Sequence, residues 1–191
     1  MVPEKLYFGP TEYSQGCRIL TRCSVRAVVD KIDKLNEEKA WFRVHPQFKH
    51  IFHMFKEPNH MNQGFWMLLL QTAHTDRLSE CWFVVNGVPI RYSLGEHALL
   101  SELDCRDYPV DYNNLGNTKF VEKHFGRADK IKIGDVEEKL NEMKDTSVDR
   151  KKMALLWFLC KVVKAKYKTD GTIDTFLLSV VSDLNVCKSI P

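Results

Sequence analysis

An Asn-Gly dipeptide between two runs of β-branched and aromatic residues is the feature that most restricts how this chain can fold. The runs are Cys81-Trp82-Phe83-Val84-Val85 and Val88-Pro89-Ile90-Arg91-Tyr92, and Asn86-Gly87 joins them. Both central residues of a type I′ turn need a positive φ, which Asn and Gly adopt most readily. The sequence therefore predicts a β-hairpin. Pro89 lacks an N–H, so it also predicts a free edge on the second strand.

A helix is expected directly after the hairpin. Ser93-Leu94-Gly95-Glu96 has the spacing of a capping box, in which the serine hydroxyl and the glutamate carboxylate satisfy backbone N–H groups at a helix start. This spacing predicts a helix over residues 94–103, which Gly95 weakens slightly.

Most of the remaining chain has the periodicity of amphipathic helices. Apolar residues from Val25 to Leu35 repeat at the spacing of one helix face, and Ser24 precedes them as a candidate N-cap. The expected fold class is therefore α+β, mainly α, a helical domain with a central β-hairpin. The further expected elements are an extended piece over 17–23 and helices over 60–74, 135–144, 149–167 and 172–184.

Length and composition indicate one folded domain. The 191 residues are 44% hydrophobic and 28% charged, which is typical of a globular protein of this size. Residues 1–16 are expected to be irregular, and residues 17–191 to form a single globular domain. The longest purely apolar run, Met153 to Cys160, is eight residues long. Since a membrane-spanning helix needs about 20, no membrane partner is expected.

Sequence motifs for catalysis and cofactor binding are missing. The chain has neither G-x-x-x-x-G-K-[ST] nor G-x-G-x-x-G, the patterns that bind nucleotide phosphates, and no G-x-S-x-G of serine hydrolases. We therefore expect no cofactor and no enzymatic activity.

A histidine-rich window raises the question of a metal site. Structural zinc sites usually contain cysteine pairs with two to four intervening residues, whereas five separate Cys17 from Cys23. The alternative is a polar-aromatic connector in which the histidines lie among phenylalanines. The spacing favours the connector, so no metal site is expected. The histidines concerned are His45, His50, His53 and His60.

Charge is unevenly distributed along the chain. Residues 1–60 carry 10 basic and 7 acidic residues, residues 61–118 carry 3 and 7, and residues 119–191 carry 15 and 11. Two basic segments therefore flank an acidic middle. If the fold brings the two ends together, the protein has a polarised surface. The alternative is a set of solvated helix faces of mixed sign.

A cationic stripe is expected on the long helix over 149–167. At 100° per residue, one face collects Arg150, Trp157, Lys161, Lys164 and Lys168. Such a stripe could contact phosphates while the indole covers a sugar or base. The alternative is a solvated face with Trp157 at the core margin. The further candidate DNA-binding cations are Lys151, Lys152, Lys130, Lys132, Arg18, Arg22 and Arg26.

The hairpin, the helix after it and two later segments form a recognisable pattern. Its parts are Trp82-Phe83-Val84-Val85-Asn86-Gly87-Val88-Pro89-Ile90-Arg91-Tyr92-Ser93, Glu96, Ala98-Leu99-Leu100, His124-Phe125-Gly126 and Met153-Ala154-Leu155-Leu156. This pattern resembles a plant domain of unknown function carried by Mutator-like transposons. The resemblance covers about residues 17–191. Gly95 and Asp104 depart from the residues usual in that family.

The resemblance implies DNA recognition. One group of similar proteins is the VANC type of VANDAL transposons, which counteract silencing by recognising DNA motifs in their own elements. Another group accompanies a SUMO-protease-like module, whose His-Asp-Cys machinery has no match in this chain. The first group fits better. It implies a nuclear, sequence-specific DNA-binding domain of a transposon-encoded anti-silencing protein that promotes DNA demethylation. The implied partners are double-stranded transposon DNA and proteins of the silencing machinery.

The alternative function is a protein–protein interaction module without nucleic-acid binding, associated with a SUMO-protease-like protein. It would use the acidic middle or the aromatic hairpin as its contact surface. Salt dependence separates the two functions. If about five cations contact phosphates, the logarithm of DNA affinity falls against the logarithm of salt with a slope of about −4.5.

Overall fold

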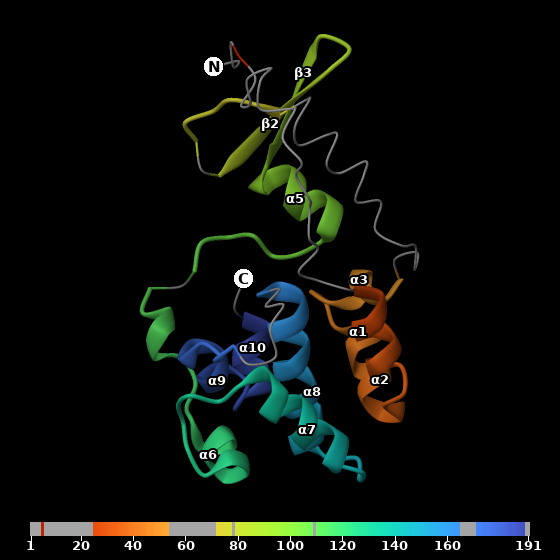
Figure 1. Cartoon of the computed structure of the whole chain (residues 1–191), viewed down its shortest axis with the longest axis vertical. Helices are drawn as coiled ribbons and strands as arrows, with labels where there is room; N and C mark the ends of the chain where they lie inside the picture. Colours follow the sequence, from red (N-terminus) through yellow and green to blue (C-terminus); the bar gives the residue numbers. More distant parts are fainter. Residues whose placement is uncertain are drawn as a thin grey trace. The chain divides into compact units, whose positions relative to one another are not determined.

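A computed structural model describes residue 5 and residues 25–53, 72–77, 79–108, 110–164 and 171–189 of the chain (Figure 1). The chain divides into two compact units. Residues 1–21 and 57–105 form the first, here called the hairpin unit, and residues 22–56 and 106–191 form the second, the helical unit. The predicted fold class, mainly helical with one β-hairpin, is confirmed. The single domain over 17–191 stays a prediction, and the irregular segment 1–16 lies outside the described residues except for Lys5.

The predicted hairpin forms at the expected residues. Strands β2 (Glu80–Val85) and β3 (Val88–Ser93) pair antiparallel, with Val85 opposite Val88. Asn86 and Gly87 have φ values of 52° and 78°, as a type I′ turn requires. In the sheet order β1-β2-β3, β3 is an edge strand. Pro89 therefore lies on the free edge, where its missing N–H costs no ladder hydrogen bond.

The prediction of a helix over 60–74 is wrong at its C-terminal end. The helix expected over 60–74 gives way to a short strand, β1 (Thr72–Ala73), which pairs with Phe83 and Trp82 of β2. Pairing with the open side of β2 satisfies backbone groups there, and this tertiary gain overrides the local preference for helix. Residues 60–71 lie outside the described residues.

The capping box starts the next helix as predicted. Helix α5 (Leu94–Ser101) has Ser93 as its N-cap, and the Glu96 carboxylate accepts a hydrogen bond from the Ser93 backbone N–H at 2.7 Å. The hydrogen bonds from Ser93 lower the pKa of Glu96 to about 2. The helix ends two residues before its predicted end, because Glu102 takes a left-handed backbone with φ of 51°.

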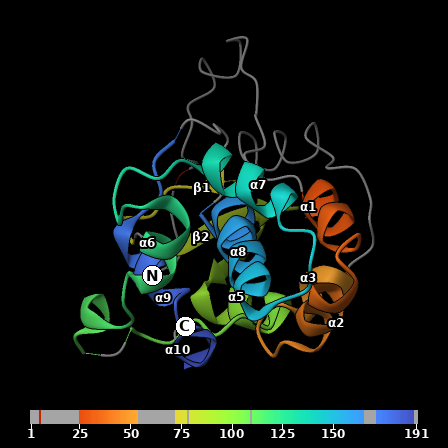
Figure 2. The same ribbon diagram turned by 90° about the horizontal axis from the view of Figure 1, so that it is seen from below.

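The helical unit is built around α8, which is buried on nearly every side. In both views α8 lies between α1, α2 and α3 on one side and α6 and α9 on the other (Figures 1 and 2). All six residues from Met153 to Phe158 are buried, so α8 is a core helix rather than an amphipathic one. The helices of this unit are α1 (Val25–Ile32), α2 (Asn36–Val44), α3 (Lys49–His53), α6 (Lys119–Phe125), α7 (Ile133–Glu142), α8 (Val148–Phe158), α9 (Thr175–Val180) and α10 (Leu184–Ser189), with the 3-10 helix η3 (Tyr112–Asn114) and the π-helix η4 (Leu159–Val163).

Several helix predictions for this unit hold, with changed ends. α1 buries Val28, Val29 and Ile32, three members of the predicted stripe. α7 begins two residues before its predicted start. The helix expected over 172–184 is split, because a turn separates α9 from α10. Among the described residues, no helix combines the length and the apolar character that crossing a membrane requires.

His45 belongs to an aromatic cluster between α2 and α3. Its ring packs against Trp41 and Phe48, at centroid distances of 4.6 and 4.3 Å. Its Nδ1 accepts a hydrogen bond from the Gln47 backbone N–H at 3.3 Å. Burial, and to a lesser degree the charge of Lys188, lowers the pKa of His45 to about 4. The neutral ring is therefore the form that the fold stabilises.

This burial predicts that acid destabilises the helical unit through His45. The unfolded histidine titrates near pH 6.5, so the stabilisation is complete above that pH and is lost as pH falls toward 4. A shift of this size corresponds to about 3 kcal/mol of unfolding free energy. His45→Phe keeps an aromatic ring and removes the titration. Urea unfolding at pH 7 and pH 4.5 should show a smaller loss on acidification for the variant. Equal losses in both proteins would contradict the prediction.

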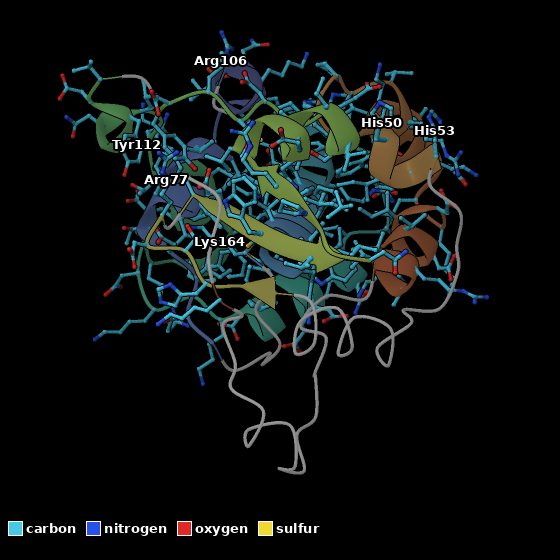
Figure 3. All side chains as sticks on the ribbon, turned by 90° about the horizontal axis from the view of Figure 1, so that it is seen from above. His50, His53, Arg77, Arg106, Tyr112 and Lys164 are labelled. Atoms are coloured by element: carbon cyan, nitrogen blue, oxygen red, sulfur yellow. The ribbon has the colours of Figure 1, made fainter. Side chains whose placement is uncertain are left out.

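The other histidines of the window give no metal centre within the described residues. α3 carries His50 and His53 (Figure 3). No group of three or more His, Cys, Asp or Glu side chains among the described residues is placed to hold an ion. His60, Cys17 and Cys23 lie outside those residues.

Candidate nucleic-acid interface

The long helix does not form the straight cationic stripe expected from its sequence. α8 ends at Phe158 and continues as the π-helix η4, in which the Lys164 N–H donates to the Leu159 carbonyl at 2.9 Å. A π-helix has i→i+5 hydrogen bonds and turns through less than 100° per residue. Lys161 and Lys164 are therefore rotated away from the face that the α-helical spacing assigned to them.

Two members of the predicted stripe are in the core, so they do not lie on an exposed cationic face. Arg150 is 6% exposed and forms an ion pair with Glu38 on α2, at 2.7 Å from Nη2 to Oε2. Trp157 is 4% exposed, and the Lys31 ammonium lies 4.8 Å from its ring centroid. Since α8 is packed on nearly every side, Arg150 and Trp157 are buried with its apolar residues.

Three further candidate cations are spread over other parts of the helical unit. Lys151 and Lys152 are half-buried in the first turns of α8, and the Lys152 ammonium donates to the Ser182 carbonyl. Arg26 is exposed on α1 and pairs weakly with Asp30, at 3.9 Å. The last three candidates, Arg18, Arg22 and Lys168, lie outside the described residues.

Lys130 and Lys132 project from an extended segment before α7. Ile131 and Ile133 on either side of Lys132 are completely buried, and the Ile131 carbonyl accepts the Ile173 N–H at 2.9 Å. Side chains alternate along an extended chain, so Lys132 points away from the core. Both lysines are exposed. Lys130 also has a positive φ of 54°, an uncommon conformation for a lysine.

The topology brings Lys161 and Lys164 to the end of the α7–α8 pair at which Lys130 and Lys132 lie. A short loop joins α7 to α8, and the two helices pack together, so they run antiparallel and the start of α7 lies beside the end of α8. Glu137 on α7 lies near Lys161. Burial alone would raise the pKa of Glu137. The hydrogen bond and charge of Lys31, together with the charge of Lys161, outweigh burial and lower the pKa below its ordinary value. We call Lys130, Lys132, Lys161 and Lys164 the basic end; Lys164 is marked in Figure 3.

The lysines of the basic end differ from Arg127 and Lys123 of the same unit, each of which forms an ion pair. Arg127 pairs with Asp135 at 3.3 Å, and Lys123 pairs with Asp149 at 2.6 Å. Within the part of the chain that the structure describes, the four lysines of the basic end have no ion pair. One open groove on α7, by contrast, is acidic, and it is lined by Gly134, Glu137, Glu138, Asn141 and Glu142.

The two units differ strongly in net charge. The helical unit contains 24 basic and 17 acidic residues, a balance of +7, whereas the hairpin unit contains 4 and 8, a balance of −4. Most cations of the two basic segments thus belong to one unit, as a polarised surface requires. A strongly positive unit with unpaired lysines attracts polyanions.

Comparison with known proteins gives a family and one curated relative. A family model described as "Domain of unknown function (DUF1985)" matches residues 69–191. An uncharacterized protein of Arabidopsis thaliana is 30% identical over 191 residues, which is 99% of this chain and 23% of that protein. The chain thus spans less than a quarter of this relative's length. No solved structure matches.

Proposed function

The chain belongs to the DUF1985 family, and from this premise we propose that it binds double-stranded DNA through the basic end of its helical unit. One observation carries the proposal. The unit with a balance of +7 presents four lysines that form no ion pair among its described residues, at one end of the α7–α8 pair. Lysine contacts to phosphates supply most of the affinity of a protein for duplex DNA.

Local electrostatics support this end of the unit. The first N–H groups of α7, directly after Lys132, carry the positive end of the helix dipole, and the Asp135 carboxylate in the first turn offsets part of it. The acidic groove along α7 would repel phosphates, which restricts the orientation in which a duplex can approach. Arg26 on α1, which packs against η4, adds an exposed cation on a neighbouring helix.

The finer part of the proposal follows from the family resemblance in the sequence. The DNA would carry motifs of a parent transposon, and the protein would act in the nucleus against silencing, with proteins of the silencing machinery as partners. Side chains that read base edges would then give specificity, while the lysines position the protein on the backbone.

One observation favours a second function, a protein–protein interaction module. The acidic hairpin unit exposes Leu99 and Leu100 on α5, at 82% and 75%. Exposed apolar residues rimmed by polar ones are typical of protein contacts. Such a module would be indifferent to heparin and DNA, whereas a phosphate-binding unit is retained on heparin and elutes with salt.

Charge reversal at the basic end tests the DNA proposal. We expect Lys130→Glu combined with Lys132→Glu to weaken binding to a fluorescent duplex at least tenfold, because two phosphate contacts become repulsive. The slope of log affinity against log salt should become shallower by about 2. Fluorescence anisotropy at several salt concentrations measures both quantities. Circular dichroism and thermal unfolding show whether the variant folds.

The control has the same change in net charge elsewhere on the helical unit. Lys144 lies in the loop at the opposite end of the α7–α8 pair, and Lys188 lies on α10; both are exposed. Lys144→Glu combined with Lys188→Glu should weaken binding far less. If both double variants lose the same affinity, net charge alone acts and the basic end is not the interface.

A further inference from the structure

A second surface of the helical unit carries aromatic rings in place of cations. Tyr108 and Tyr112 stack with centroids 4.5 Å apart and an angle of 24° between the rings. Phe176 on α9 lies edge-on to both, at 6.2 and 5.3 Å. Tyr108 is 51% exposed, and Val110 on the same loop is 91% exposed. The stack therefore leaves a large part of one tyrosine in contact with water; Figure 3 labels Tyr112.

The segment that follows Tyr112, residues 115–117, is fixed to α9 by hydrogen bonds and close packing. The Asn117 N–H donates to the Ser179 carbonyl at 3.1 Å, and the Ser179 hydroxyl donates to the Leu115 carbonyl at 3.1 Å. Gly116 lies so close that a Cβ there would be 2.3 Å from the Ser179 carbonyl oxygen. These contacts and the packing of both rings against Phe176 restrict the orientation of the tyrosines, which reduces the entropy lost on binding.

The charge beside the rings indicates what the surface can bind. Asp107 precedes Tyr108 and Asp111 precedes Tyr112, and neither carboxylate has an ion pair within the described ranges. Asp174 accepts the Phe176 N–H at 2.9 Å, which places a third carboxylate beside the aromatic group. Aromatic faces attract cations, and nearby carboxylates strengthen that attraction while they repel phosphates.

We propose that Tyr108 and Tyr112, with Asp107 and Asp111, form a docking surface for a lysine- or arginine-bearing segment of a protein partner. The cation would lie over the exposed face of Tyr108, and the carboxylates would balance its charge. The exposed Val110 would pack against the aliphatic part of the partner. This surface is distinct from the basic end, and the proposal does not depend on DNA binding.

Peptide binding to the full chain tests the proposal. The probe is a fluorescent eight-residue peptide that alternates arginine and glycine, and its neutral match has citrulline in place of arginine. By anisotropy at low salt we expect the arginine peptide to bind and the citrulline peptide to bind at least tenfold more weakly. Tyr108→Ala should weaken arginine-peptide binding about tenfold, whereas Tyr108→Phe keeps the aromatic face and should retain it.

Variants of acidic residues show whether the peptide binds at the tyrosines or is attracted by acidic residues anywhere on the chain. Asp107→Asn combined with Asp111→Asn should weaken binding, and asparagine tolerates the positive φ of 61° at position 111. Glu138→Gln combined with Glu142→Gln on α7 removes the same charge and should have no effect. Binding unchanged by Tyr108→Ala, equal binding of the citrulline peptide, or equal losses in the two acidic variants would overturn the proposal. So would a loss of duplex DNA binding in Tyr108→Ala.

Discussion

Replacing Arg150 with methionine is expected to remove about 3–5 kcal/mol of unfolding free energy, the cost of leaving a buried charge without its partner. The guanidinium makes two hydrogen bonds to Glu38, Nε to Oε1 at 2.8 Å and Nη2 to Oε2 at 2.7 Å. It also donates to the Lys144 carbonyl and the Thr146 hydroxyl, at 2.6 and 2.9 Å. Glu38 is completely buried, so no water can replace these donors.

The ion pair with Arg150 also lowers the pKa of Glu38. Burial favours the neutral acid, but the hydrogen bonds and charge of Arg150 hold the pKa of Glu38 below its ordinary value. Urea unfolding at pH 7 measures the loss in Arg150→Met. The double variant Glu38→Leu/Arg150→Met should lose less than the sum of the two single variants, because it leaves no unpaired charge. A loss below about 1 kcal/mol in Arg150→Met would contradict the buried pair, and would return Arg150 to the candidate DNA contacts.

Gly116→Ala is expected to cost about 3 kcal/mol, for two reasons that act together. Gly116 has a φ of 84°, a conformation that disfavours any side chain, and its Cβ would overlap the backbone of Ser179. A backbone carbonyl cannot rotate away as a side chain can. The loop after η3 would have to move off α9, with loss of the hydrogen bond between Asn117 and Ser179.

Gly126→Ala in the same unit is the matched control. Gly126 also has a positive φ, 66°, but nothing lies within 4 Å of its Cβ position. Alanine there should cost only about 1 kcal/mol, the backbone strain alone. Thermal or urea unfolding of both variants gives the difference. Equal costs would show that the loop does not pack closely on α9.

The parts of the fold that depend on neighbouring residues could be predicted from the sequence. The Asn86-Gly87 turn and the Ser93–Glu96 capping box are local, so a few residues determine them. Residues far apart in the chain decided the parts that failed. The end of the predicted helix over 60–74 pairs with β2, and Arg150 meets a glutamate 112 residues away. No periodicity can indicate such partners.

For the candidate site, too, the sequence predicted some features correctly and missed those that depend on distant residues. Counting at 100° per residue assigned Arg150, Trp157 and Lys164 to one face, but α8 is buried on nearly every side and then becomes a π-helix. The charge pattern of the sequence was more informative, because most cations of the two basic segments do belong to one compact unit. The i, i+4 spacing of Tyr108 and Tyr112 was the only signal of the aromatic surface, and in a loop with no expected helix it had no evident meaning.

The salt dependence of duplex binding by the unaltered protein tests the central proposal most directly. A mixed-sequence duplex and a duplex from a candidate parent transposon are titrated by anisotropy at several salt concentrations. Four lysines on phosphates predict a slope of about −4 for log affinity against log salt. Tighter binding of the transposon duplex would support sequence reading. Absence of binding to either duplex at low salt would contradict the proposal that this chain binds DNA.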